Sequence, residues 1–210
     1  VNYGFVTLYS LNKYFPYTLA IIADMLMNPT FPEKEMEVVI ESNRQQFLVN
    51  STRVEVIARK QLNRSLFGVQ HPFGRFAEAS DYDRINPEIL REFYRKYYHS
   101  GNCSVYVSGK VTPEIIRCIE LHLGDASWGE TRIMPALQLM DPQPIPEKHV
   151  FVEKADALQS SLKMGGFMMD RTHPDFLKAR VMVTLFGGYF GSRLSSNIRE
   201  EKGYTYGIYS

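Results

Sequence analysis

A proline-rich segment divides this chain into two parts. Residues 131–149 show neither helical nor strand periodicity, and proline fixes its own φ and offers no backbone N–H, so such a stretch does not continue a helix or a sheet. We therefore predict a linker at residues 131–149, between a first domain at 1–130 and a second at 150–210. The prolines of the segment are Pro135, Pro142, Pro144 and Pro146.

Two kinds of pattern occur on both sides of this segment. Short runs that alternate apolar and polar residues predict strands, and longer runs with apolar residues three or four positions apart predict helices. Their order predicts an α+β fold, with helices packed on one side of antiparallel sheets. The predicted strands are 4–11, 103–109, 150–154, 160–168 and 204–210. The predicted helices are 17–27, 32–49, 53–67, 86–98, 112–123, 174–186 and 192–202.

The charge balance limits the class of partner. The chain has 24 basic and 23 acidic side chains, a formal net charge of +1. A nucleic acid or an anionic membrane surface is usually bound through a marked excess of basic charge, which is absent here. The sequence has no apolar run of the about 20 residues that a membrane-spanning helix needs. We expect neither a nucleic-acid partner nor a membrane span.

The histidines do not have the spacing of a metal site. No two of them are three or four residues apart, and neither His-Glu-x-x-His nor His-x-x-Glu-His occurs, so one helical face cannot present two imidazoles to zinc. No Cys-x-x-Cys pair occurs either. We predict no cofactor and no metal ligand set within this chain. The five histidines are His71, His99, His122, His149 and His173.

The most informative segment is residues 186–210. Arg199 lies on a predicted helix, and Tyr206 follows seven residues later on a predicted strand, with a turn at Gly203 between them. A guanidinium and a phenol that are brought together form a pair of donors suited to peptide carbonyls or a developing oxyanion. The alternative is structural: Arg199 pairs with Glu200 or Glu201, and the tyrosine fills a strand face.

This segment resembles the signature of the M16 (pitrilysin/insulinase-like) zinc metallopeptidases. The resemblance implies a LuxS/MPP-like metallohydrolase fold. It also implies that Arg199 and Tyr206, with Gly188 and Ser192, bind substrate beside a zinc ion that another domain holds. The matching residues are Gly188, Ser192-Arg193-Leu194, Arg199-Glu200, Gly203 and Tyr206.

Residues 28–47, 71–85 and 90–109 also resemble M16 sequences. By this resemblance, the part before the linker is the later half of a first M16-like domain, and the part after it is the opening half of a second. The helix with His-x-x-Glu-His would precede this chain. A gapless register anchored on Phe31 places the third zinc-ligand position at Gln46, whose neutral amide is a poor zinc ligand. A shift of a few residues places Glu41 there instead.

We therefore interpret the chain as a zinc-less M16-like domain with no catalytic residue of its own, which helps a zinc-bearing M16 subunit or domain to hold a peptide. One alternative is a fragment of an active M16 zinc endopeptidase whose histidine motif lies upstream. The other is a non-enzymatic peptide-binding or scaffold module. Because the truncated halves would expose apolar faces, we also expect self-association. The resemblance to bacterial members favours a periplasmic location.

Overall fold

The computed structural model describes residues 4–124, 128 and 140–210. The part of the predicted linker at 131–139 lies outside these residues. The chain forms two compact units, Val1–Lys163 and Met164–Ser210. The division into domains at 1–130 and 150–210 stays a prediction.

Local sequence signals determine where the helices of the first unit begin and end. Pro87 and Pro113 each occupy the first turn of a helix, where a missing N–H costs no hydrogen bond. Asn86 caps its helix by accepting a hydrogen bond from the backbone N–H of Ile89 at 2.9 Å. Gly68 ends another helix with a φ of +82°. The main helices are α1 (Phe15–Met27), α2 (Glu33–Ser51), α3 (Val54–Phe67), α4 (Ala79–Tyr82), α5 (Pro87–Tyr97) and α6 (Pro113–Ile119). Short elements are η1 (Asn12–Tyr14), η2 (Ser100–Asn102) and η3 (Glu120–Gly124).

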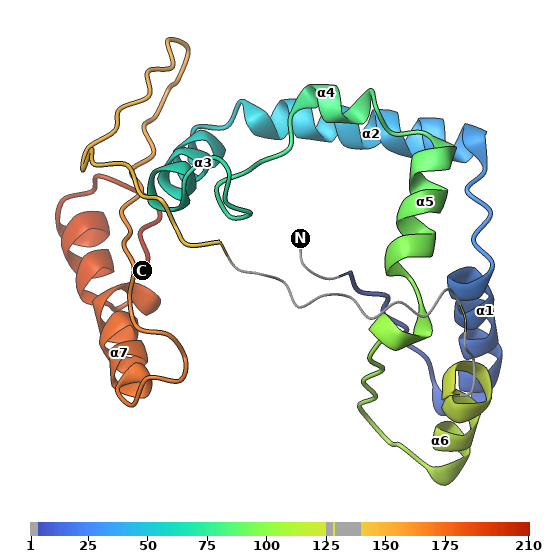
Figure 1. The fold of residues 1–210 in the computed structure, drawn as a ribbon. Helices are drawn as coiled ribbons and strands as arrows, with labels where there is room; N and C mark the ends of the chain where they lie inside the picture. Colours follow the sequence, from blue (N-terminus) through green and yellow to red (C-terminus); the bar gives the residue numbers. More distant parts are fainter. Residues whose placement is uncertain (1–3, 125–127, 129–139) are drawn as a thin grey trace. The chain divides into compact units, whose positions relative to one another are not determined.

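The buried apolar contact of the first unit lies between α1 and α6 (Figure 1). Leu19 and Ala23, one helical turn apart on α1, are buried, as is Ile115 on α6. Side chains spaced by four residues share one helix face, so this spacing aims both α1 residues in the same direction. The two helices thus pack through a narrow apolar stripe.

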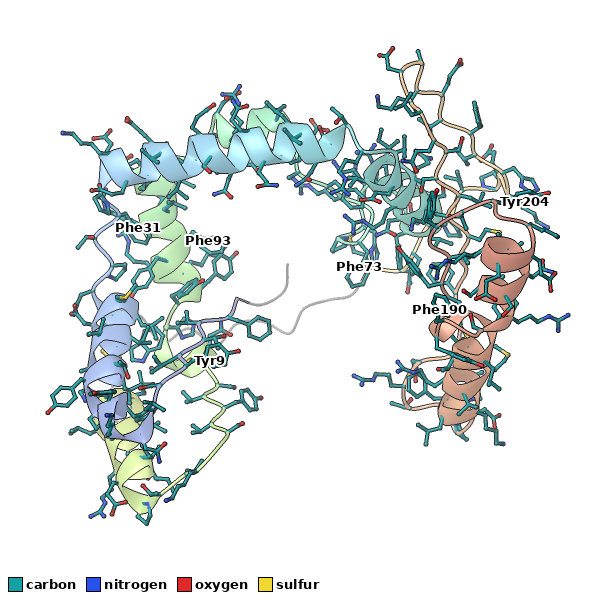
Figure 2. The ribbon with its side chains drawn as sticks, turned by 180° about the vertical axis from the view of Figure 1, so that it is seen from behind. Tyr9, Phe31, Phe73, Phe93, Phe190 and Tyr204 are labelled. Carbon is teal, nitrogen blue, oxygen red and sulfur yellow. The ribbon has the colours of Figure 1, made fainter. Side chains whose placement is uncertain are left out.

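Tyr94 on α5 connects that helix to the end of α1. Its hydroxyl donates to the backbone oxygens of Leu26 and Met27, the latter at 3.2 Å. Burial raises the pKa of Tyr94 above its ordinary value, because the charged phenolate loses hydration there. The ring also lies edge-on to Phe31, with centroids 6.0 Å apart, and Phe31 is labelled in Figure 2. The two contacts fix α5 against the residues that follow α1.

The short helix α4 lies along α2 (Figure 1). Arg44 of α2 forms an ion pair with Asp83 at 3.2 Å. Phe47, one turn further along α2, packs on Tyr82 with ring centroids 5.5 Å apart. Since the ion pair is largely exposed, the aromatic contact contributes the larger share of the attachment.

The second unit contains the α-helix α7 and two shorter elements of π-helical geometry, η4 and η5. Helix α7 (Phe176–Val183) continues directly into η4 (Thr184–Gly188), and η5 (Ser195–Glu201) follows after a turn. Before α7, the carboxylate of Asp170 accepts hydrogen bonds from the hydroxyl and the N–H of Thr172, which lower its pKa. The predicted helices of both units are confirmed, with bounds within a few residues of those expected.

The α+β prediction is wrong. In the residues that the structure describes, all regular elements are helices, and none of the five predicted strands forms. Residues 4–11, 103–109, 150–154, 160–168 and 204–210 have irregular backbone instead. The antiparallel sheets of a LuxS/MPP-like fold are therefore not supported.

The physical reason is that alternation is a local pattern, whereas a strand needs a hydrogen-bonded neighbour and a covered face. Several aromatic side chains of these segments are uncovered: Tyr9 and Tyr106 are each 93% exposed, and Phe151 is 87% exposed. The apolar positions that suggested a buried sheet face thus point into solvent. Among the described helices, none is both long and apolar enough to cross a bilayer.

The cap on α5 generates a stability prediction. Replacing Asn86 by Ala leaves the N–H of Ile89 without its acceptor, so the free energy of unfolding falls by about 1 kcal/mol. Asn43→Ala, in the interior of α2, is the matched control and leaves stability unchanged or slightly higher, because alanine is the better helix former. Urea denaturation followed by circular dichroism measures both. Equal losses in the two variants would contradict the capping role.

Candidate functional site

The candidate site lies in the second unit, on η4, η5 and the residues after them. Gly187 is buried because Ser210 lies directly against it. The N–H of Ser210 donates to the Gly187 oxygen at 3.2 Å, and its hydroxyl donates to the Val183 oxygen at 2.9 Å. A Cβ at Gly187 would stand 2.8 Å from the Ser210 nitrogen, so only glycine allows this approach.

Arg199 has an aromatic neighbour that the sequence did not predict. Its guanidinium carbon lies 4.4 Å from the ring centroid of Phe190, a cation–π geometry. Arg199 lies on η5, and Phe190 lies in the turn between η4 and η5. The expected alternative, an ion pair of Arg199 with Glu200 or Glu201, is not among the contacts of the described residues. Contacts across a turn have no signal in residue spacing, which is why Phe190 was missed.

Tyr206 is 98% exposed, so the structure does not pack it against Arg199. Gly203, in the turn between them, has a φ of +65°, the left-handed conformation with which glycine commonly ends a helix. The two predicted donors are thus separate, with Arg199 half-buried and Tyr206 exposed. A ligand that contacted both would have to lie across the turn.

The other two predicted substrate-binding residues, Ser192 and Gly188, differ in their exposure to solvent. Ser192 is fully buried, and its hydroxyl has no hydrogen-bond partner among the described residues. Its backbone oxygen accepts from the Ser196 N–H at 2.9 Å, which begins the following helical turn. Gly188 is exposed, but a Cβ there would stand 3.3 Å from Thr184. Ser192 therefore supports the turn from within, and its substrate-binding role stays a prediction.

Exposed aromatic residues surround the motif in the sequence. Each side chain is more than half exposed. An aromatic side chain has a large apolar area, so a partner that covers it gains much buried surface. Such exposure is typical of surfaces that bind a peptide or another protein. The residues are Tyr189, Phe190, Tyr204, Tyr206 and Tyr209, of which Phe190 and Tyr204 are labelled in Figure 2.

Gln46, the position predicted to match a zinc ligand, is exposed on α2. Glu41, the alternative, accepts a hydrogen bond from the Gln45 amide at 2.6 Å. Across residues 4–124, 128 and 140–210, no three His, Cys, Asp or Glu side chains come close enough to hold a metal ion. Among the described side chains, neither Gln46 nor Glu41 therefore belongs to a cluster that could hold a metal ion.

Comparison with known families identifies the class of protein. A family model described as the peptidase M16 inactive domain matches residues 84–210. This match covers more than half of the chain and includes the whole candidate site. The chain therefore belongs to the M16 peptidase family, as an inactive domain.

Curated relatives agree with the family. The chain is 24% identical over 203 residues to "Uncharacterized zinc protease YmxG" of Bacillus subtilis, covering 95% of this chain and 48% of that protein. It is 23% identical over 208 residues to "Non-peptidase homolog YmxG" of Helicobacter pylori, covering 97% and 47%. "Mitochondrial-processing peptidase subunit alpha-1" of Dictyostelium discoideum is 27% identical over 129 residues, 57% of this chain and 19% of that one. The chain spans about half the length of the first two relatives.

A solved structure supports the fold. The crystal structure of a peptidase M16 inactive domain from Pseudomonas fluorescens matches with a TM-score of 0.69 at 22% identity. The match covers 92% of this chain and 46% of that chain. At this identity the likeness supports the fold alone.

Proposed function

We propose that this inactive M16 domain holds a peptide through Arg199 and Tyr206 for a zinc-bearing M16 subunit or domain that cleaves it. The observation that carries the proposal is the half-buried Arg199, whose guanidinium carbon lies 4.4 Å from the ring centroid of Phe190 within a run of exposed aromatic residues. Stacking on a ring restricts the long arginine side chain while its N–H groups remain able to donate. A peptide carbonyl is a matching acceptor.

The relatives support the assembly part of this proposal. One relative is named a subunit of the mitochondrial-processing peptidase, and another is named a non-peptidase homolog. A domain without ligands for zinc contributes to peptide cleavage only if a partner supplies the metal. The cleaving partner is therefore a second M16 subunit or a further domain of a longer protein.

The names of two relatives support a second candidate function. The relatives in Bacillus subtilis and Rickettsia bellii are both called uncharacterized zinc proteases. On this reading, the chain is part of a longer peptidase whose His-x-x-Glu-His motif lies outside the given residues. The parent sequence discriminates the two candidates, because only the second requires that motif in the same polypeptide.

Arg199→Ala and Tyr206→Phe test the peptide-holding role. Tyr206→Phe removes one O–H donor and Arg199→Ala removes the whole guanidinium, so each is expected to weaken peptide binding about tenfold or more, as for at least one lost hydrogen bond worth about 1.5 kcal/mol. The matched controls are Arg180→Ala, in the same unit outside the proposed pair, and Tyr106→Phe, at an exposed position of the first unit. Fluorescence anisotropy with labelled peptides measures the dissociation constants. If the controls weaken binding as much as Arg199→Ala does, the pair has no special role.

A metal and activity assay tests the zinc-less assignment. The purified chain is expected to bind less than one tenth of an equivalent of zinc and to cleave no peptide. Adding a zinc-bearing M16 subunit from the same source restores cleavage, and Arg199→Ala reduces that restored rate without changing the zinc content. Elemental analysis and a quenched-peptide assay give the two readouts. One tightly bound zinc ion per chain would refute the assignment.

We further propose that the isolated chain associates with itself. On α1, Tyr17, Ile21 and Met25 form an exposed apolar stripe with a spacing of four residues.

Light scattering tests this association. The chain is expected to have at least twice its 24.2 kDa mass. Ile21→Lys places a charge in the α1 stripe and shifts the equilibrium toward monomer. Leu158→Lys, at a fully exposed position outside any helix, is the control and leaves the mass unchanged. A monomeric wild-type chain at all concentrations would exclude the proposal.

A further inference from the structure

Among the described residues, the arginines of intermediate exposure differ in what surrounds them. The guanidinium of Arg44 has a carboxylate partner, Asp83, at 3.2 Å. Arg199 forms no ion pair with any described residue, although it is partly removed from water. A cation in that position is stabilised by an anion that comes to it. The arginines of this kind are Arg44, Arg64 and Arg199.

The two glutamates that follow Arg199 do not neutralise it. Both are exposed, and a carboxylate oxygen of Glu201 accepts a hydrogen bond from the side-chain amide of Asn197 at 3.2 Å. Residues one or two positions apart on a helix do not face each other, which is why Glu200 and Glu201 point away from the guanidinium. The acceptor that Arg199 lacks therefore has to come from a ligand.

A closed turn holds the ring on which Arg199 rests. The N–H of Ser192 donates to the Tyr189 oxygen at 3.0 Å, which closes a turn over Phe190. The Ser192 oxygen in turn accepts from the Ser196 N–H at 2.9 Å, which connects this turn to η5, the helix of Arg199. The Phe190 ring, 4.4 Å from the guanidinium carbon, thus limits the positions of the guanidinium before a ligand binds.

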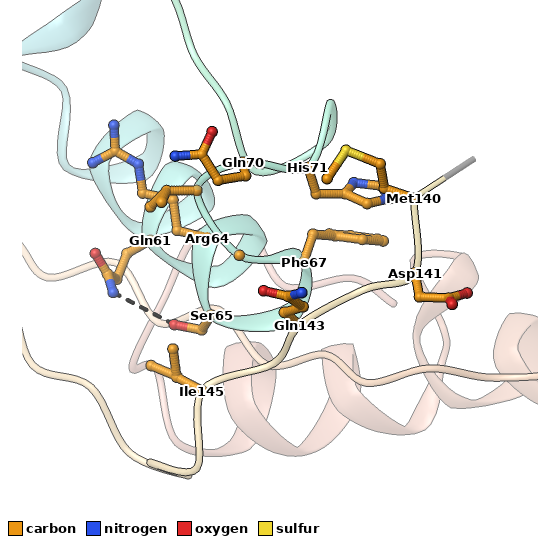
Figure 3. A pocket seen from close by; sticks show the side chains of 12 residues that line it. Gln61, Arg64, Ser65, Phe67, Gln70, His71, Met140, Asp141, Gln143 and Ile145 are labelled. Carbon is orange, nitrogen blue, oxygen red and sulfur yellow. Dashed lines mark hydrogen bonds between the residues drawn. The ribbon is translucent and has the colours of Figure 1, made fainter. Parts of the chain in front are cut away.

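Arg64 shows how much access to the nitrogens matters. It lines a cavity of about 430 Å³ in the first unit, between α3 and residues 140–145, and Figure 3 shows the lining residues. Its Nε is fully buried without a partner, and its guanidinium lies over Phe76, outside the lining, so a ligand in the cavity does not reach this donor. No nitrogen of Arg199 is among the buried, unpartnered atoms of the described residues, so its N–H groups are open to solvent.

The shape of a guanidinium favours one kind of acceptor. Its N–H groups form a planar fork, and a carboxylate offers two oxygens in one plane, whereas a backbone carbonyl offers one. Hydrogen bonds between two charged groups are also the stronger ones. The second unit, Met164–Ser210, has six Lys and Arg but four Asp and Glu, so its net charge favours an anionic ligand too.

We propose that Arg199, held on the Phe190 ring, donates to a carboxylate of the bound peptide, so that the site selects acidic peptides over neutral ones. The carboxylate is that of an aspartate or glutamate side chain or of the peptide's C-terminus, because both present the same pair of oxygens. This inference rests on the proposed peptide-holding role and adds the substrate class. Tyr206, with a single O–H, suits a backbone carbonyl.

Calorimetric titration of the full chain with three peptides tests the substrate class. The first peptide has both ends blocked and one glutamate between two phenylalanines, and the second has glutamine in place of that glutamate. The third also has glutamine, but its C-terminal carboxylate is free. The first or the third is expected to bind about fivefold more tightly than the neutral second peptide, the usual difference between a charged and a neutral hydrogen bond.

The better of the two charged peptides identifies the source of the carboxylate. A preference for the first assigns it to a side chain, and a preference for the third assigns it to the C-terminus. If neither charged peptide binds more tightly than the neutral one, the proposal is wrong.

Variants locate the preference at Arg199. Arg199→Gln is expected to abolish the preference for the charged peptide, whereas Arg180→Gln, which removes an exposed positive charge of the same unit, leaves it unchanged. Phe190→Leu lowers the preference about twofold because the ring no longer holds the guanidinium, and Phe190→Tyr retains it. Thermal unfolding shows that each variant is folded. A full preference in folded Phe190→Leu would contradict the positioning role of the ring.

The same titrations separate this inference from the peptide-holding role. If Arg199→Gln weakens the charged and the neutral peptide equally, Arg199 holds peptides without selecting a carboxylate, and only the inference is wrong. If Arg199→Gln weakens neither peptide, the peptide-holding role itself is refuted.

Discussion

The free carbonyl groups at helix C-termini are the constraint on which this structure depends. A helix leaves its last carbonyls without partners, and a chain with few buried apolar residues must satisfy them by other means. Here donors distant in sequence do so. The Tyr94 hydroxyl bonds the end of α1, the backbone of Gln143 and Ile145 bonds the end of α3, and Ser210 bonds Val183 and Gly187. These contacts attach irregular segments to helices, and they position both the cavity and the residues of the M16 signature.

This constraint explains what the sequence could predict. Helix positions follow from local chemistry: Asn86-Pro87 begins α5 and Gly68 ends α3, and both signals act within a few residues. Strands depend on partners far away in the sequence, so alternation around Tyr9 or Tyr106 predicted a sheet that does not form. The same limit applies to the candidate site. Arg199 was found through an ordered motif, whereas its stacking on Phe190 depends on how a turn folds.

Two residues of the M16 signature differ in exposure although they lie close together in the sequence. Arg199 is half-buried against the ring of Phe190, whereas the hydroxyl of Ser192 is fully buried and has no hydrogen-bond partner among the described residues. A peptide can therefore reach Arg199 without a change in the turn, but it cannot reach the Ser192 hydroxyl. This difference is why the proposed peptide contacts rest on Arg199 and the exposed Tyr206.

The match to the peptidase M16 inactive domain covers residues 84–210, which include Arg199 and Tyr206 but neither Gln46 nor Glu41. Zinc hydrolysis needs three protein ligands that converge on one point, whereas the peptide contacts that we propose need only two donors that a ligand can reach. The two requirements are therefore separable. A chain that meets only the second contributes to peptide cleavage when a partner meets the first, which is the division of roles that we propose.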